Sequence, residues 1–312
     1  MLKHLVQTKE WSDFKNIYGT ISNTVGGIYY TLHRIPFTNK FYAYAPKVNS
    51  FDINFPELME QLKKENVIAI NFDSPNNYLD SENSLQATKI FEDHGGIIAA
   101  RTTYPDATVI LDISKPEDEL LKNFHTKHRY NLNLAKKKNL TIVSEINEKT
   151  LEDFYYLQKV TSKRQGYIVK DKLYYDTLIN TFNKKGRAII TTCYLNEEPI
   201  ASWLFITQED YSYYLYGGSD ENYRNLYPST LVLWESIINL KKLGVKTIDL
   251  FGACTDLNNE KDHYYGFTIF KLRFGGVHKK YIKSYDFILS PIYYLLFNSA
   301  QKIRWFLLKF LK

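Results

Sequence analysis

Two short stretches of the sequence carry the same order of signals: Lys64-Glu65-Asn66-Val67-Ile68-Ala69-Ile70-Asn71-Phe72-Asp73 in the first half, and Lys242-Leu243-Gly244-Val245, running on to Leu250-Phe251-Gly252, in the second. In each stretch the end of a predicted helix is followed by a short apolar run, which is typical of a buried strand. Each also follows a predicted hairpin, at residues 27–33 and 40–45 in the first half and at residues 187–194, 200–207 and 211–216 in the second. Hairpin, helix and buried strand therefore occur twice, in the same order.

This order predicts an α/β fold built from two tandem domains of the N-acetyltransferase (GNAT) type. We place the first domain at residues 1–140 and the second at residues 141–286. We expect a C-terminal helix at residues 287–312 to pack back on the first domain. A chain of 312 residues is long enough for two hydrophobic cores. Two unrelated α/β domains remain the alternative.

Composition and charge indicate a globular protein without a disulfide framework. Hydrophobic residues make up 44% of the chain and charged residues 24%, as in folded, water-soluble proteins. The two cysteines, Cys193 and Cys254, lie far apart in the sequence, so we expect neither a disulfide nor a zinc cluster, and no metal site. The net charge of +6 is consistent with phosphate-bearing partners, although solubility alone explains it equally well.

The two ends of the chain bear on its compartment. The start has no signal-peptide pattern, and the longest apolar stretch, residues 287–297, is too short to span a bilayer. We therefore expect a cytoplasmic protein, and a monomer. The C-terminal helix combines apolar residues at helical spacing with the basic residues Lys302, Arg304, Lys309 and Lys312. Such a tail can lie at an anionic membrane, so we expect peripheral membrane contact through residues 302–312, with packing on the first domain as the alternative.

The sequence lacks the phosphate-binding loop that an acetyl-CoA-dependent enzyme needs. Such an enzyme has a glycine-rich turn before its long helix, where backbone amides hold a pyrophosphate. Here Tyr227 and Pro228 occupy that position, so acetyl-CoA is not expected. Nucleotide-binding loops, nucleophile elbows and zinc-protease motifs are absent from the sequence as well. The sequence thus favours an enzyme that joins two ready-made substrates without a cofactor, or a binding protein.

Several motifs follow one another from about residue 5 to residue 285. They are Gln7-Thr8-Lys9-Glu10-Trp11 followed by Lys15, Arg101 through Ser114, Lys127 to Lys138, Tyr216-Gly217-Gly218-Ser219, Leu233-Trp234-Glu235, Ile248-Asp249-Leu250-Phe251-Gly252, and Gly266 through Gly276. In order and spacing this set resembles the Fem family (FemA, FemB, FemX), the non-ribosomal aminoacyltransferases of peptidoglycan cross-bridges. Only about thirty residues join Leu151 to Phe182, so the chain resembles the shorter FemX type, without the long helical-hairpin arm of some members.

The resemblance implies transfer of an amino acid from an aminoacyl-tRNA to the stem-peptide amine of a peptidoglycan precursor, a reaction of the EC 2.3.2 type. The acceptor would be UDP-MurNAc-pentapeptide or a lipid-linked precursor, and the donor would be contacted at the tRNA acceptor end. An aminoacyl ester is already activated, so the reaction needs orientation, proton removal and oxyanion stabilisation rather than a cofactor. The basic stretch from Lys127 to Lys138 would follow the tRNA phosphates, or would be an ordinary solvated helix face.

The resemblance also implies which residues form the site. Lys271, held by its aromatic neighbour Phe270, would supply positive charge for catalysis, with a solvated lysine as the alternative. The precursor-binding residues would be Trp11, Lys15, Asp73, Arg164, Tyr167 and Tyr216. Of these, Lys15 and Arg164 would converge on a diphosphate through charge-assisted hydrogen bonds. Trp11 would otherwise be a core residue, and Asp73 would otherwise cap a turn.

Two functions of other kinds remain open. One is a GNAT-fold acyltransferase that uses another activated acyl donor, which the altered phosphate-binding position disfavours. The other is a non-catalytic protein that has kept the fold and binds nucleic acid or the precursor.

Overall fold

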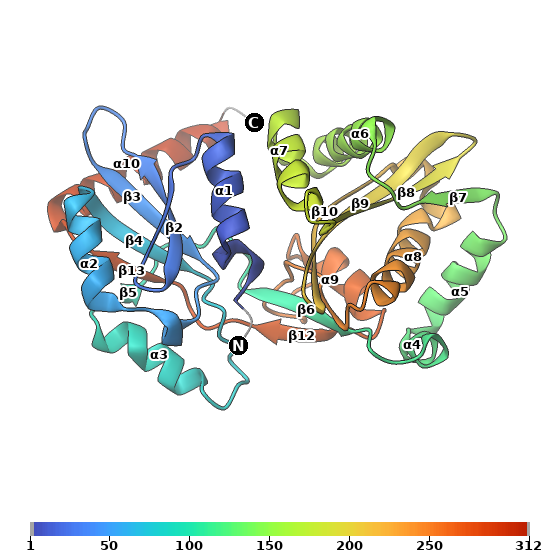
Figure 1. Cartoon of the computed structure of the whole chain (residues 1–312), viewed down its shortest axis with the longest axis horizontal. Coiled ribbons are helices and arrows are strands. Elements are labelled where there is room, and N and C mark those ends of the chain that lie inside the picture. The colour runs from blue at the N-terminus through green and yellow to red at the C-terminus, as the bar shows by residue number, and fades with distance from the viewer. Residues whose placement is uncertain (1–2, 311–312) are drawn as a thin grey trace. The chain divides into compact units, whose positions relative to one another are not determined.

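Figure 1 shows the computed structural model of the chain, which describes residues 3–310. The chain divides into two units. Unit 1 comprises Met1–Asp106 and Lys280–Lys312, and unit 2 comprises Ala107–Lys279. Each unit is built on one mixed β-sheet with helices, so the predicted α/β class is confirmed.

Unit 1 contains six strands and its own set of helices. The strands are β1 (Ser22–Val25), β2 (Ile28–Arg34), β3 (Phe41–Pro46), β4 (Val67–Asp73), β5 (Ile97–Ile98) and β13 (Tyr285–Ile288). The helices are η1 (Leu5–Gln7), α1 (Lys9–Tyr18), η2 (Ser50–Asp52), α2 (Phe55–Lys64), α3 (Ser84–Asp93) and α10 (Pro291–Phe310). The strand order is β1-β2-β3-β4-β13-β5, with β3 and β4 parallel and α2 connecting them.

Unit 2 contains a seven-stranded sheet. Its strands are β6 (Ala107–Asp112), β7 (Leu140–Val143), β8 (Ala188–Leu195), β9 (Glu198–Gln208), β10 (Tyr211–Ser219), β11 (Thr247–Asp249) and β12 (Val277–Lys280). Its helices are α4 (Glu117–Asn123), α5 (Thr126–Lys136), α6 (Glu148–Gln165), α7 (Lys172–Asn183), η3 (Glu221–Leu226), α8 (Pro228–Lys242) and α9 (Tyr265–Leu272). The strand order is β12-β6-β11-β10-β9-β8-β7, with β10 and β11 parallel and α8 connecting them.

The two sheets share one plan. Antiparallel strands lead into a parallel pair, β3 with β4 in unit 1 and β10 with β11 in unit 2, and each crossover consists of a 3-10 helix followed by an α-helix. Beyond the parallel pair, each sheet continues with an antiparallel strand from a distant part of the chain: β13 beside β4, and β6 beside β11. Hairpin, helix and buried strand therefore recur in the order that the sequence predicts.

Local sequence explains the sharpest of these elements. All seven residues of β4 are buried, as expected of a central strand covered on both faces. The helix α2 begins where the Asn54 side chain accepts a hydrogen bond from the Glu57 backbone amide, and it has Pro56 in its first turn. The segment from Glu117 to Lys136 forms two helices rather than one, because Phe124 is extended and separates α4 from α5.

The chain passes between the units at places that differ from the predicted boundaries. The first unit ends at Asp106 rather than at residue 140, because β6 pairs with β11 in unit 2. The return into unit 1 comes at Lys280, and the segment predicted as a helix from residue 287 begins inside strand β13. The helix itself starts at Pro291 and packs on unit 1.

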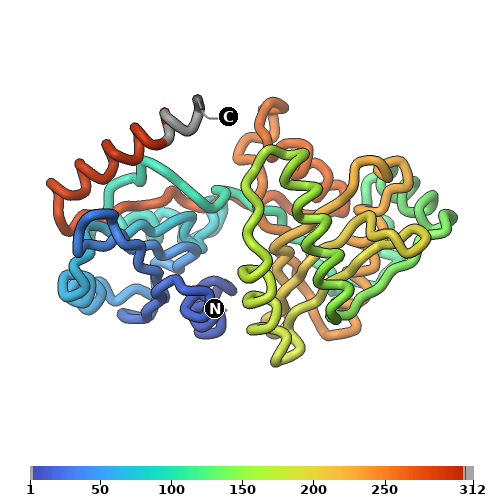
Figure 2. Tube along the Cα trace, turned by 90° about the horizontal axis from the view of Figure 1, so that it is seen from above, coloured from blue at the N-terminus to red at the C-terminus, as the bar shows by residue number. Residues whose placement is uncertain are grey.

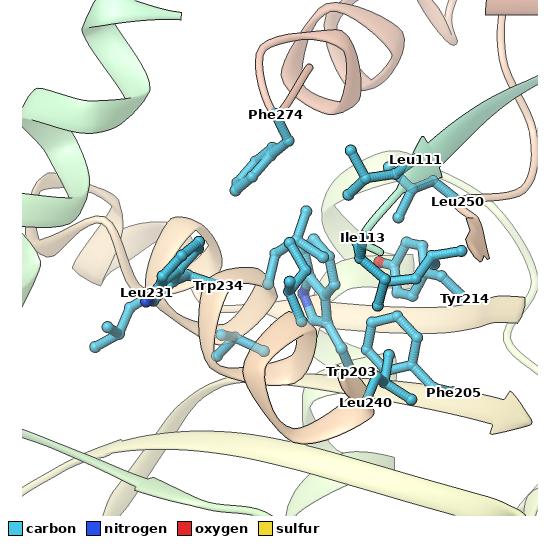
Figure 3. Packing of buried hydrophobic residues seen from close by; sticks show 14 of the residues in the cluster. Leu111, Ile113, Trp203, Phe205, Tyr214, Leu231, Trp234, Leu240, Leu250 and Phe274 are labelled. Carbon is cyan, nitrogen blue, oxygen red and sulfur yellow. The ribbon is translucent and has the colours of Figure 1, made fainter. Parts of the chain in front are cut away.

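Each unit has its own aromatic core. In unit 2, Trp203 stacks on Tyr214 with ring centroids 4.3 Å apart, next to Phe205, Trp234 and Phe274 (Figure 3). In unit 1, Phe287 from β13 packs on Phe55 and Phe72, with centroids 5.2 and 5.3 Å away. The C-terminal strand therefore supplies part of the first core as well as a sheet partner.

A buried carboxylate holds the C-terminal helix against the sheet of unit 1. Asp286 on β13 accepts hydrogen bonds from the Tyr294 hydroxyl at 2.6 Å, the Asn71 amide at 2.7 Å and the Tyr42 hydroxyl at 3.1 Å. Tyr294 lies on α10, and Asn71 and Tyr42 lie on β4 and β3. Buried carboxylates are costly unless they are hydrogen-bonded, so this network fixes the start of α10.

We predict that Tyr294→Phe lowers the free energy of unfolding by about 1.5–3 kcal/mol, because a buried carboxylate loses one donor. Urea unfolding of the full chain measures the change. Tyr293→Phe is the matched control, since Tyr293 is partly exposed on the same helix. Equal stability of Tyr294→Phe and Tyr293→Phe would contradict the anchoring role of Tyr294.

Candidate functional site

The parallel strands β10 and β11 separate near the middle of the sheet of unit 2. They pair only over Tyr211–Tyr213 and Thr247–Asp249. Beyond this point β10 has a register shift between Tyr214 and Tyr216 and continues along β9, whereas β11 ends and the chain turns through Phe251 with a φ of 52°. Strands that separate leave backbone groups outside the ladder, and these groups need other partners.

Lys271 supplies those partners from α9. Its side chain is fully buried, and its amine donates hydrogen bonds to the carbonyls of Phe251 and Gly252, the latter at 2.6 Å. The amine also lies 3.7 Å from the centroid of the Phe267 ring. The alternative of a solvated lysine is therefore wrong. Lys271 fixes the turn that follows β11.

The protonation of Lys271 is set by opposing effects. Burial lowers the pKa of Lys271 well below its usual value, and the nearby Asp249 carboxylate acts in the opposite direction. Asp249 is itself buried and accepts hydrogen bonds from the Thr108 hydroxyl and from the Phe251 backbone amide. The amine and the carboxylate therefore hold the same turn from two sides.

Sequence reasoning assigned the wrong aromatic partner to this amine. Phe270 faces the core, where it packs near Trp203 and His128 with centroids 5.8 and 5.1 Å away. Phe267, one helical turn before Lys271, faces the amine instead. The i, i+4 spacing on a helix would have identified Phe267, but α9 was not among the predicted helices.

Three of the predicted precursor-binding residues come together at the far end of β10. The Tyr216 hydroxyl lies 3.0 Å from the Tyr174 hydroxyl, and burial, followed by Tyr174 and then Tyr167, raises the pKa of Tyr216 well above its usual value. Arg164, exposed near the end of α6, donates to the Ser219 carbonyl at 3.1 Å. The structure thus places Arg164, Tyr167 and Tyr216 around one strand end, with a guanidinium and partly exposed tyrosines available to a ligand.

Gly218 lets α6 lie close to that strand, and Gly217 leaves room for the Tyr214 hydroxyl of the same strand. A Cβ atom at Gly217 would be 1.9 Å from the Tyr214 hydroxyl oxygen, and one at Gly218 would be 2.5 Å from the Leu157 carbonyl oxygen. Neither position has room for a side chain. The predicted Tyr216-Gly217-Gly218-Ser219 motif therefore has a packing reason, because it brings Arg164 and Tyr216 into one neighbourhood.

The remaining candidates lie in unit 1. Trp11 is buried and packs edge-on against Phe14, as in the core alternative, and the Lys15 amine lies 5.6 Å from the Trp11 ring centroid. The charge of Lys15, together with burial as the larger cause, lowers the pKa of His33. Lys15 is thus a partly exposed cation over an aromatic surface.

Asp73 at the end of β4 is fully buried and accepts four hydrogen bonds. The donors are the Tyr44 and Ser284 hydroxyls and the backbone amides of Thr103 and Tyr104. These bonds hold the segment that follows the strand, as the turn-capping alternative predicts. A side chain without exposed surface shapes a site rather than contacting a ligand.

Two further predictions can be located in unit 2. The basic stretch from Lys127 to Lys138 contains most of α5, whose inner face buries His128 and Leu132 while Lys127 and Lys136 are exposed.

The backbone of Tyr227 has a left-handed conformation with a φ of 57°, and Pro228 is the first residue of α8. Side chains therefore occupy the turn where an acetyl-CoA enzyme has glycine. Among residues 3–310, no group of three or more His, Cys, Asp or Glu side chains is placed to hold a metal ion.

Known proteins resemble this chain in sequence and in fold. The FemAB family model matches residues 37–198 and 190–302. The lipid II:glycine glycyltransferase of Staphylococcus epidermidis is 22% identical over 381 aligned positions, covering 94% of this chain and 90% of that protein. The Staphylococcus aureus protein of the same name is 24% identical, with coverages of 62% and 61%.

Among solved structures, the crystal structure of FemX superimposes with a TM-score of 0.80 at 20% identity, covering 94% of each chain. A tandem GNAT protein from the clavulanic acid biosynthesis pathway has a TM-score of 0.51 at 9% identity, covering 85% of this chain and 81% of that one. These matches confirm the predicted tandem GNAT-like fold without a long helical arm. Within the described part of the chain, no helix is both long and apolar enough to cross a bilayer.

Replacing Lys271 with Met tests its protonation. Because burial lowers the pKa of Lys271 in the folded protein, the unfolded chain binds more protons between that lowered pKa and the ordinary value of 10.5. Across this window the unfolding free energy of the wild type should rise with pH relative to Lys271→Met, by up to about 1.4 kcal/mol per pH unit. Urea unfolding at several pH values measures it.

Lys242→Met is the matched control for that experiment, because Lys242 is exposed at the end of α8. We expect no comparable pH-dependent difference for it. If the stability difference between the wild type and Lys271→Met were independent of pH, the buried amine would be as readily protonated as a free lysine.

Proposed function

Because the chain belongs to the FemAB family, we propose that it is an aminoacyltransferase that adds an amino acid to the stem-peptide amine of a peptidoglycan precursor. The observation that carries the proposal is the match over 94% of the chain to a protein named lipid II:glycine glycyltransferase. That name supports a lipid-linked precursor as the acceptor, with UDP-MurNAc-pentapeptide as the soluble alternative. The reaction would take place on the cytoplasmic side of the membrane.

The donor in this proposal is an aminoacyl-tRNA, contacted at its acceptor end. The acceptor amine attacks the ester carbonyl carbon, a C–N bond forms and the ester C–O bond breaks. The amine loses a proton, and the ribose oxygen of the tRNA leaves with one. The ester is already activated, so this chemistry requires no cofactor. A pyrophosphate would need free backbone amides at the turn before α8. Because the side chains of Tyr227 and Pro228 occupy this turn, the aminoacyl-tRNA is favoured as donor over acetyl-CoA.

Lys271 is the proposed catalytic group in unit 2. Its hydrogen bonds fix the Phe251 and Gly252 carbonyls at the separation of β10 and β11, which supports a role in aligning the reacting groups. In its ammonium form it would also stabilise the oxyanion that develops on the ester carbonyl. Phe270 would act only by packing α9 against Trp203 in the core of unit 2.

The other residues would bind the precursor. Arg164 and Lys15 are exposed or partly exposed cations suited to the diphosphate, and Tyr167 and Tyr216 offer hydroxyls and ring surface beside Arg164. The Trp11 ring would hold the Lys15 amine in place. Asp73 would shape the binding site for the acceptor by holding the backbone amides of Thr103 and Tyr104.

We predict that Lys271→Met lowers kcat about a hundredfold with little effect on precursor affinity, the usual loss when one preorganised donor is removed. If the ammonium form is the active one, wild-type kcat should also fall as pH rises through the lowered pKa of Lys271, below the range of an ordinary lysine. Steady-state assays across pH measure both effects. Lys242→Met is the control, and turnover of Lys271→Met within threefold of the wild type would remove Lys271 from the mechanism.

We predict that Arg164→Ala and Lys15→Ala mainly raise KM for the precursor, because a phosphate clamp binds the ground state and the transition state alike. Each lost charge-assisted contact should cost about 1.5–3 kcal/mol of binding. Lys163→Ala is the matched control, since Lys163 is the exposed neighbour of Arg164 on α6. An unchanged KM for both variants would show that neither residue binds the diphosphate.

The function itself is tested by incubating the chain with a mixture of charged tRNAs and each precursor, followed by mass spectrometry of the product. We expect a mass increase of one or more amino-acid residues. Precursor binding without any mass increase would favour a non-catalytic binding protein. An acyl group derived from another donor would favour the general acyltransferase.

A further inference from the structure

The helix α10 is apolar on two opposite sides. Its inner side is held by the sheet of unit 1, where Phe297 stacks on Tyr42 with centroids 4.9 Å apart and the Tyr294 hydroxyl bonds to Asp286. Figure 2 shows α10, in red, along one side of unit 1. A helix that only packed on a sheet would turn a polar face to water.

The outer side of α10 carries a row of exposed apolar residues instead. This outer stripe consists of Ile292, Leu295, Leu296, Ile303 and Phe306, whose exposed fractions lie between 60% and 74%. Consecutive members are three, one, seven and three residues apart, which places them on one face of a helix, and the exposed Ser299 and Ala300 lie in the longest gap. Single exposed apolar residues are ordinary on protein surfaces, but a continuous row marks a contact surface.

A hairpin lies next to α10. The turn between β2 and β3 carries Phe37, which is fully exposed in a left-handed conformation with a φ of 63°. The same turn ends at Lys40, whose amine lies 4.5 Å from the ring centroid of Tyr293 on α10. The hairpin is therefore joined to α10, and its tip adds a large apolar side chain that no core residue covers.

The charges around the outer stripe are of one sign. At 100° per residue, Lys302 and Arg304 fall on opposite flanks of the stripe, and both are exposed. The sequence from Pro291 to Lys312 has no acidic residue. Of the basic residues predicted for membrane contact, the Lys309 side chain and Lys312 lie outside the described residues. An apolar row between two basic flanks matches a surface with an apolar interior and anionic groups at its edge.

We infer that the outer stripe of α10, with the Phe37 hairpin tip, docks unit 1 on an anionic lipid bilayer. The helix lies in the plane of the interface with its apolar residues among the upper acyl chains. The flanking Lys302 and Arg304 extend to the lipid head groups. The role of this contact rests on the proposed function, because docking would bring the site to a lipid-linked acceptor. The contact itself needs no precursor.

The test is co-sedimentation of the full chain with vesicles that contain no precursor, either of phosphatidylcholine alone or with phosphatidylglycerol added. We expect binding to the anionic vesicles at low salt and weaker binding at high salt. Leu296→Glu/Ile303→Glu should reduce the bound-to-free ratio at least about tenfold, and Lys302→Gln/Arg304→Gln should reduce it about fivefold per charge. Leu85→Glu on α3 is the matched control, since Leu85 is 80% exposed in the same unit.

Equal binding of the wild type and Leu296→Glu/Ile303→Glu would overturn the inference, and so would equal binding to neutral and anionic vesicles. A concentration-dependent dimer in sedimentation velocity that disappears in Leu296→Glu/Ile303→Glu, without vesicle binding, would assign the stripe to a second copy of the chain. Thermal melting of each variant verifies folding. Turnover of soluble UDP-MurNAc-pentapeptide by Leu296→Glu/Ile303→Glu should stay at the wild-type level, so failure of docking is distinguishable from failure of the proposed function.

Discussion

The central strands β4 and β11 need a partner on each edge, and each takes one partner from a remote part of the chain. β4 pairs with β13 from the C-terminal end, and β11 pairs with β6, the first strand of unit 2 in the sequence. An unpaired edge in the middle of a buried sheet would leave a row of amides and carbonyls without hydrogen bonds. This pairing sets the limits of both units, carries Phe287 into the first core and places α10 against unit 1.

Both central strands end in a buried aspartate, Asp73 on β4 and Asp249 on β11, and unit 2 adds a buried lysine at the turn that follows β11. Asp73 ends β4 and gathers four donors, whereas Lys271 reaches the turn after β11 and donates to two carbonyls. An unpaired charge in such a place would cost several kcal/mol, so the donor set in one unit and the acceptor set in the other are conditions for folding. The same contacts fix the backbone where each central strand leaves its sheet, which is where a ligand site can be held rigid.

Strong local patterns made most of the elements predictable. The mostly apolar run of β4 and the glycine that ends the helix α8 are predictable because their signals lie within a few residues. The unit boundary was not predictable in this way, because nothing within β6 indicates that its partner is Thr247–Asp249. In the candidate site, Arg164, Tyr167 and Tyr216 lie around one strand end, whereas the contact of Phe267 with Lys271 depends on α9, which the sequence pattern does not predict. The burial of Lys271 depends on tertiary packing that no local pattern contains.

The position of β13 has a consequence for the order in which the chain can fold during synthesis. Unit 2 is one continuous segment, whereas β4 and β5 lack the strand between them until residue 288 has left the ribosome. Domains generally fold as units, with the N-terminal one first. Here the first sheet must wait, with β4 unpaired on one edge, through the synthesis of the whole of unit 2, whose own last strand ends at Lys280. A chaperone that shields the unpaired edge of β4 would therefore have to stay bound until β13 is available.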